Sequence, residues 1–326
     1  MAPPPSPDTD SASEAVGVDL GGTKLLTGVV GAGPEVLHSS EKSSSGQTSD
    51  ELMDTLELEL RTAVAARPDV GAIGLGVPCT IDHERGLAIQ AVNLPIVDLP
   101  IRDLISDRLG LPVSIDNDGN TAALAEHRWG AARGARNAVL LTIGTGIGGG
   151  LILGGEVYRG STGAGAELGH MVIDQDGPPC QGACPNRGCL EALASGTALA
   201  KQAGLAAARN PDSALGKLAA EAEAVDGRQA TDAALAGDRV AIQVVATIGR
   251  RLGAGLSSIA NIFEPEVIVV GGGVMAAGEL LLAPAREEME KRALAPMNGT
   301  RVVPAQLGAH AGMIGAAAMA MIESGA

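Results

Sequence analysis

Aromatic side chains are nearly absent from this chain of 326 residues, which holds one Trp, one Tyr and one Phe. Its core must therefore be built from Ala, Val, Leu and Ile, and a stacked aromatic cage for a base or sugar is nearly excluded. Positive charge is also scarce, since 23 Lys and Arg face 38 Asp and Glu and the net charge is −15. This balance argues against nucleic acid as a binding partner, because nucleic-acid binding requires a basic surface.

Long apolar runs are missing as well. No stretch approaches the ~18 apolar residues of a membrane span, and residues 1–13 have neither the charged nor the apolar region of a signal peptide. We expect these residues to form a disordered tail, and the protein to be cytoplasmic and not bound to a membrane. In a reducing compartment, clustered cysteines bind metal more often than they form disulfides.

Glycine, in contrast, is abundant and clustered, with 46 residues. Residues 15–31, "AVGVDLGGTKLLTGVVG", and 138–155, "AVLLTIGTGIGGGLILGG", each show an apolar run, a glycine turn and another apolar run. This pattern predicts two β-hairpins, and their repetition predicts two similar α/β domains facing a cleft; two unrelated hairpins are the alternative. Strands alternate with helices elsewhere, including a helix over 49–66 with a Thr48–Glu51 capping box.

The first glycine turn, "DLGGTK", has the composition of a phosphate site. Amides of small residues can approach a phosphate closely, and phosphoryl transfer needs Mg²⁺ and a cation. The alternative is a plain hairpin turn with an exposed lysine. The candidate residues are Asp19 for Mg²⁺ or its water, Gly21, Gly22 and Thr23 for phosphate, and Lys24 for charge.

The second turn, "TIGTGIGGG", interleaves threonines and glycines over 142–150. It loosely resembles a dinucleotide-binding G-x-G-x-x-G, which would require a helix directly after the glycines. The sequence instead continues as a strand, so a dinucleotide site is not expected here.

A third cluster, "SIDNDGN" at 114–120, follows a predicted buried strand. A carboxylate at this point can take a proton from a hydroxyl nucleophile while a neighbouring amide holds other hydroxyls. Asp118 and Asn117 are the candidates for these roles. Asp116 is a neighbouring carboxylate that we do not expect to act as the base. The alternative is an N-cap cluster for the following helix.

Four residues have the types and spacing of a closed zinc site, namely His170, Cys180, Cys184 and Cys189. Reduced thiols without a metal are the alternative, and Cys79, far off in sequence, is expected to be a buried thiol. Two glutamates near this cluster, Glu167 and Glu191, could accept hydrogen bonds from vicinal hydroxyls. Taken singly, each is better explained as a surface acid.

Together these motifs resemble the ROK family of repressors, open reading frames and kinases, and most closely its bacterial sugar kinases that act on glucose. The resemblance spans residues 15–324 and includes "DLGGTK", "NDGN", "GTGIGGGLILGG", "CLEALASG" and "PEVIVVGGG". One departure is the cysteine loop "CQGACPNRGC", which has two extra residues between its first two cysteines.

The resemblance implies a duplicated, actin-like (RNase H-like) α/β fold with an interdomain cleft. The expected domains are residues 14–135 with the C-terminal helix at about 311–326, and residues 136–310. The implied activity is transfer of phosphate from ATP·Mg²⁺ to the 6-hydroxyl of glucose, with Asp118 as base and a structural Zn²⁺. The implied sugar ligands are Asn93, Asn117, Asp118, Glu167, His170 and Glu191, and the implied nucleotide contacts include Gly144, Thr145, Gly146, Gly271, Gly272 and Gly273.

Three alternatives to this activity stay open. Another hexose, such as N-acetylglucosamine, N-acetylmannosamine or fructose, could be the substrate. A phosphoryl donor other than ATP, such as polyphosphate, could be used. A long polyanion should need a basic groove, which the acidic composition does not indicate. A sugar-responsive regulator should need an N-terminal DNA-binding segment, and about 14 residues precede the first hairpin. A homodimer or homotetramer is expected from the family.

Overall fold

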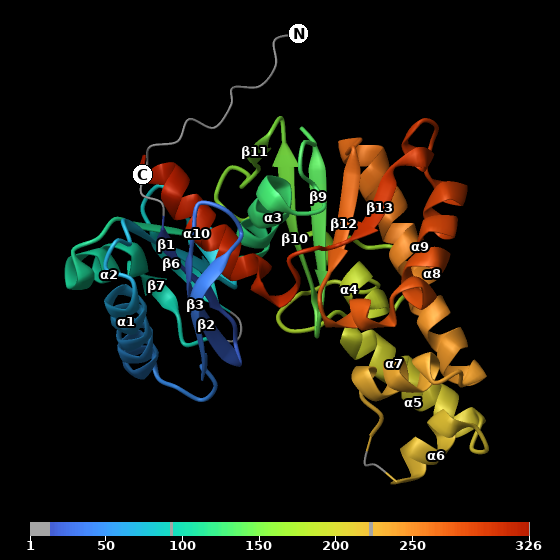
Figure 1. Cartoon of the computed structure of the whole chain (residues 1–326). Coiled ribbons are helices and arrows are strands. Elements are labelled where there is room, and N and C mark those ends of the chain that lie inside the picture. Colours follow the sequence, from blue (N-terminus) through green and yellow to red (C-terminus); the bar gives the residue numbers. More distant parts are fainter. Residues whose placement is uncertain (1–13, 92–93, 222–223, 326) are drawn as a thin grey trace. The chain divides into compact units, whose positions relative to one another are not determined.

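The computed structural model describes residues 14–91, 94–221 and 224–325. The tail predicted for residues 1–13 and the sugar ligand predicted at Asn93 lie outside this description. The chain divides into two compact units (Figure 1): the described residues up to Ala125 together with those from His310 onward, and residues 126–309. Within the described ranges, no helix combines the length and apolarity needed to cross a bilayer.

The first unit is built on a five-stranded sheet in the order β3-β2-β1-β4-β8. The predicted hairpin is confirmed as the antiparallel pair β1–β2, and β4 and β8 run parallel to β1. A small antiparallel sheet, β5-β6-β7, follows β4. The bounds are β1 Ala15–Leu20, β2 Lys24–Val30, β3 Val36–Ser43, α1 Ser49–Ala66, β4 Ala72–Val77, β5 Cys79–Asp82, β6 Leu87–Ala91, β7 Val97–Leu99, α2 Ile101–Leu109, β8 Val113–Asn117 and α10 Ala311–Glu323.

The second unit repeats this plan, with a five-stranded sheet in the order β11-β10-β9-β12-β13. Its hairpin β9–β10 is antiparallel, while β12 and β13 run parallel to β9. The duplication of the two predicted hairpins thus extends to whole sheets. The bounds are β9 Ala138–Ile143, β10 Ile147–Leu153, β11 Glu156–Val157, α4 Leu190–Ala194, α5 Gly196–Arg209, α6 Ala214–Glu221, α7 Gly227–Leu235, α8 Arg239–Phe263, β12 Val267–Gly271, α9 Glu279–Arg292 and β13 Arg301–Pro304, with α3, Asp118–Trp129, leading from the first unit into the second.

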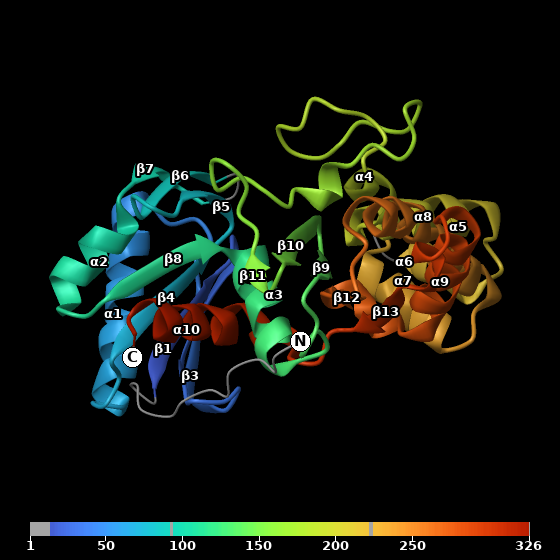
Figure 2. The same cartoon turned by 90° about the horizontal axis from the view of Figure 1, so that it is seen from above.

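The C-terminal helix α10 lies directly on the backbone of the first sheet (Figure 2). A Cβ atom at Gly17 of β1 would lie 2.0 Å from the carbonyl oxygen of Met313, and one at Gly74 of β4 would lie 1.8 Å from that of Ala316. Real Cβ atoms never approach so closely, so these strand positions require glycine. The helix itself is rich in alanine and is buried from Ala311 to Met321.

The opposite face of the same sheet carries the larger apolar side chains. Side chains alternate between the two faces of a strand, so Val16 and Val18 face away from Gly17 and α10. They join a buried cluster with Leu52, Leu56 and Leu60 of α1. Helix α1 begins with the predicted capping box, in which Thr48 and Glu51 bond each other's backbone N–H groups. The second unit has its own core, formed mainly by its sheet and by α5, α7, α8 and α9.

Candidate active site and metal centre

Three polar residues end strand β8 and begin helix α3. The buried carboxylate of Asp116 accepts hydrogen bonds from the backbone N–H of Asn117, at 2.7 Å, and from the side chain of Asn120, at 2.8 Å. The amide of Asn117 donates to the Cys79 carbonyl at 3.3 Å. The carboxylate of Asp118, the first residue of α3, accepts from the backbone N–H of Gly119. Asp116 therefore holds the turn, while Asn117 and Asp118 are only half-buried.

Asp19 lies on the face of β1 that α10 covers. A Cβ atom at Gly312, in the first turn of α10, would lie 2.7 Å from its carboxylate oxygen. Burial and the negative charge of Asp118 raise the pKa of Asp19 to about 6, against a smaller opposing effect of Lys24. A carboxylate of strand β1 and one at the start of helix α3 thus lie near each other within the first unit, and a divalent cation would relieve their repulsion.

The glycine turn after Asp19 is closed by its own backbone. The N–H of Gly21 donates to the carbonyl of Lys24 at 2.8 Å, and the Gly21 carbonyl accepts from the Ser44 hydroxyl. Gly22 and Thr23 are accessible. The Lys24 ammonium lies 3.0 Å from the carboxylate of Glu41, and both side chains are exposed. This ion pair is worth little in water, so Lys24 can exchange it for another anion.

The second glycine turn borders a cavity of about 760 Å³ within the second unit. The N-termini of α5 and α7 reach the same cavity, and each is capped by a side chain, Ser195 for α5 and Asp226 for α7. The hydroxyl of Thr197 and the N–H of Gly196 bond the carbonyls of Thr145 and Gly144, which fixes the turn against α5. The lining residues are Gly144, Thr145, Gly196, Thr197, Ala200, Asp226, Gly227, Arg228, Thr231, Asp232, Gly273, Val274 and Ala276.

Sequence reasoning found only part of this wall. Gly273 lines the cavity together with Gly144 and Thr145, so the structure brings together three of the predicted nucleotide contacts. Gly272 instead packs on a neighbouring strand, since a Cβ atom there would lie 2.4 Å from the Ile143 carbonyl oxygen. Gly271 packs similarly, near the side chain of Ala305. The wall formed by the start of α7 was missed because its residues carry no recognisable motif.

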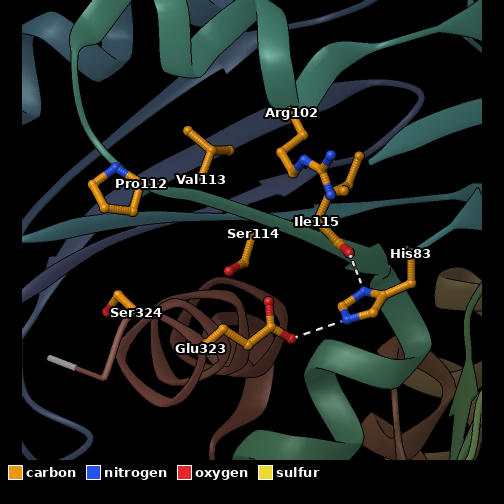
Figure 3. A pocket seen from close by; sticks show the side chains of 8 residues that line it. All are labelled: His83, Arg102, Pro112, Val113, Ser114, Ile115, Glu323 and Ser324. Carbon is orange, nitrogen blue, oxygen red and sulfur yellow. Dashed lines mark hydrogen bonds and ion pairs between the residues drawn. The ribbon is translucent and has the colours of Figure 1, made fainter. Parts of the chain in front are cut away.

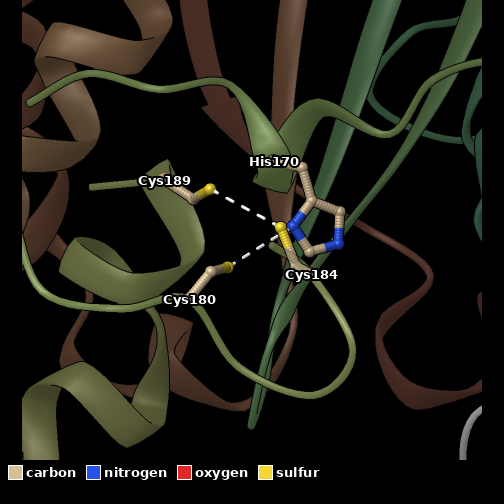
Figure 4. A group of neighbouring side chains, drawn as sticks. All are labelled: His170, Cys180, Cys184 and Cys189. Atoms are coloured by element: carbon tan, nitrogen blue, oxygen red, sulfur yellow. Dashed lines mark hydrogen bonds between the residues drawn. The ribbon is translucent and has the colours of Figure 1, made fainter. Parts of the chain in front are cut away.

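The four predicted metal ligands come together in the second unit (Figure 4). One ligand atom from each of His170, Cys180, Cys184 and Cys189 lies within 4.8 Å of every other. The Cys180 sulfur lies 3.5 Å from Nδ1 of His170, and the sulfurs of Cys184 and Cys189 lie 4.0 Å apart. A tetrahedral zinc with Zn–S bonds of about 2.3 Å has edges of about 3.8 Å, so the cluster fits this ion.

Outside this cluster, Cys79 behaves as the expected buried thiol. Burial and the charge of Asp118 raise its pKa to about 12, so the thiol stays protonated and unreactive at neutral pH.

The two predicted glutamates lie beside this cluster. The carboxylate of Glu167 lies 3.8 Å from Nε2 of His170, on the opposite side of the ring from Nδ1. Glu191 accepts from the backbone N–H of Ile147 at 2.8 Å and lies 3.9 Å from the Cys180 sulfur. A Cβ atom at Gly146 would lie 2.3 Å from this carboxylate, so Gly146 makes room for Glu191 in addition to shaping the turn.

A smaller cavity, of about 320 Å³, lies in the first unit at the start of β8 (Figure 3). His83 bridges its two sides, with Nδ1 at 2.9 Å from the Ile115 carbonyl and Nε2 at 3.0 Å from the carboxylate of Glu323 in α10. The hydroxyl groups of Ser114 and Ser324 also line it. No sequence pattern predicts this cavity, because its walls come from four separate segments.

Comparison with known proteins identifies the architecture. The model of the ROK family matches residues 15–323. A glucokinase of Streptomyces coelicolor is 35% identical, with 94% of this chain and 96% of that protein aligned. The crystal structure of a ROK family glucokinase from Streptomyces griseus, in complex with glucose and AMPPNP, has a TM-score of 0.82 at 35% identity and covers 94% of this chain and 99% of that one. The xylose repressor of Bacillus subtilis is 30% identical, with 93% of this chain and 76% of that protein aligned.

Proposed function

Since the chain belongs to the ROK family, we propose that it is a sugar kinase that transfers the γ-phosphoryl group of ATP to the 6-hydroxyl of glucose. The similarity to glucokinases over nearly the whole chain carries this proposal. The cavity of about 760 Å³ beside the glycine turn at Gly144 and Thr145 supports the nucleotide part, because the backbone of a glycine turn can approach phosphates closely. The same cavity would hold the nucleoside against the first turn of α7.

Asp118 is the proposed base. Its carboxylate would take the proton of the 6-hydroxyl as that oxygen bonds to the γ-phosphorus, while the bond from phosphorus to the β–γ bridging oxygen breaks and ADP leaves. Asn117 would hold a ring hydroxyl from the same turn. The hydrogen bonds of Asp116 support both roles, because they fix the turn in which Asn117 and Asp118 lie.

Two metal ions belong to this proposal. Asp19 would hold Mg²⁺ or its water, which neutralises phosphate charge, and its raised pKa suits a partner of opposite charge. A structural Zn²⁺ would be held by His170, Cys180, Cys184 and Cys189. Bound through Nδ1, His170 would leave Nε2 for a sugar hydroxyl beside Glu167, and Glu191 would accept from another. A homodimer or homotetramer stays a prediction.

The decisive experiment measures ADP release with ATP·Mg²⁺ and glucose, N-acetylglucosamine, N-acetylmannosamine or fructose. A kcat/KM for glucose at least tenfold above the others is the expected result. Asp118→Asn should lower kcat by about 10²–10⁴-fold with glucose still bound, while Asp54→Asn, an exposed acid on α1, should change nothing. Full turnover by Asp118→Asn would refute the role of the base.

A regulator is the second candidate, because a xylose repressor is among the relatives. It predicts sugar binding, seen by calorimetry, without ADP release from any sugar. Preference for another hexose would change the substrate and leave the mechanism intact.

A further inference from the structure

Glu126 is a fully buried carboxylate near the end of helix α3. One carboxylate oxygen accepts a hydrogen bond from the backbone N–H of Ala131 at 2.8 Å. The other accepts from the backbone N–H groups of Gln306 and Leu307, at 2.9 and 2.8 Å. A buried charge is tolerated only when it is well bonded, and here three backbone N–H groups meet that need.

The donors lie in the second unit, in the two connections next to the points where the chain crosses between units. Ala131 lies in the connection from α3 to β9, and Gln306 and Leu307 lie in the connection from β13 to α10. These connections are far apart in sequence, yet both are bonded to one side chain. The contact is closely fitted, because a Cβ atom at Gly130 would lie 2.1 Å from the Glu126 carboxylate.

Helix α3 joins the Glu126 carboxylate to the turn at Asn117 and Asp118. It begins at Asp118, the proposed base, and Glu126 follows eight residues later, or about 12 Å along the axis at 1.5 Å per residue. An unbroken helix of this length moves as a rigid rod. Fixing its far end to both connections therefore restrains the helix that begins at Asp118.

We propose that Glu126 is a positioning residue, which holds α3, and through it Asp118, by bonding the end of this helix to both connections. The proposal rests on the sugar kinase activity proposed above. Glu126 does not touch the substrate in this scheme. Its loss should therefore lower the rate of transfer and leave the binding of glucose largely unchanged.

The first test is amide hydrogen exchange on the full chain. In Glu126→Ala, all three amides should exchange at least tenfold faster than in the wild type. Glu126→Gln keeps one acceptor oxygen, which should stay with the pair of donors at Gln306 and Leu307, so only Ala131 should exchange faster. Glu290→Gln, an exposed acid on α9, is the control. Unchanged exchange at all three amides in Glu126→Ala would overturn the contact.

The second test separates positioning from a general loss of structure. We expect both variants to lower kcat, by about tenfold for Glu126→Gln and more for Glu126→Ala, with the glucose KM within threefold of wild type and a full stoichiometry of glucose binding. A wild-type kcat in Glu126→Ala would overturn the proposal, and so would a loss of kcat matched by a loss of binding-competent protein. An inactive wild type would instead refute the kinase itself, and this role of Glu126 with it.

Discussion

Replacing Asp19 by Asn should make the protein more stable at neutral pH while impairing its activity. The pKa of Asp19 rises from 3.8 to about 6 in the folded protein, first because of burial and second because of the charge of Asp118. Since the folded state then binds more protons than the unfolded state between these values, stability falls as the pH rises from about 4 to 6. A pKa shift of this size destabilises the folded protein by at most about 3 kcal/mol. The full destabilisation is present above pH 6.

The measurement is the free energy of unfolding in urea, for wild type and Asp19→Asn, between pH 3.5 and 8. We expect the variant to be more stable by about 1–3 kcal/mol at pH 7.5 and equal to wild type below pH 4. In an Asp118→Asn background the gain should shrink, because the second cause of the shift is removed. Asp54→Asn is the control for removing an exposed acid. A gain that does not vary with pH, or no gain at pH 7.5, would refute this reasoning.

Three further predictions concern packing and the metal. Gly146→Ala should raise the glucose KM tenfold or more by displacing Glu191. The Cβ atom of Gly144→Ala would meet nothing within 4 Å, so this variant should keep the wild-type glucose KM. Equal effects of the two variants in steady-state kinetics would argue against Glu191 as a sugar ligand. Cys184→Ser should reduce bound zinc from one per chain to a trace by elemental analysis, and Cys79→Ala should not; retention of zinc by Cys184→Ser would exclude the proposed ligand set. Gly315→Ala places a Cβ atom 1.7 Å from the Thr121 carbonyl oxygen and should lower the free energy of unfolding by about 3 kcal/mol. The control Gly33→Ala places its Cβ atom in open space and should hardly change this free energy. Similar denaturation midpoints for the two variants would show that α10 can shift.

The predicted actin-like α/β class is confirmed. It could be predicted from the sequence because the patterns that indicate it are local. Apolar runs on both sides of a glycine turn specify a hairpin within about 17 residues, and the Cys and His residues of the metal cluster lie within 20 residues of one another. Both signals are local. The capping box at Thr48 is local too.

What was missed depends on residues far apart in the chain. From the sequence alone Glu126 is an ordinary helix residue, because its partners Gln306 and Leu307 follow 180 and 181 positions later. The start of α7 lines the 760 Å³ cavity through the packing of helices that carry no shared motif. Gly146 was assigned to phosphate alone, since its contact with Glu191 appears only after folding.

The placement of α10 has a consequence for the order of events during protein synthesis. Its glycine-fitted contacts complete the first unit, yet its residues leave the ribosome after the entire second unit. The second unit is continuous in sequence and can close its core as soon as β13 has emerged. The second unit can therefore complete its core before the first, although N-terminal domains usually fold first. Until translation reaches α10, the backbone of β1 and β4 that it covers stays open to solvent and to chaperones.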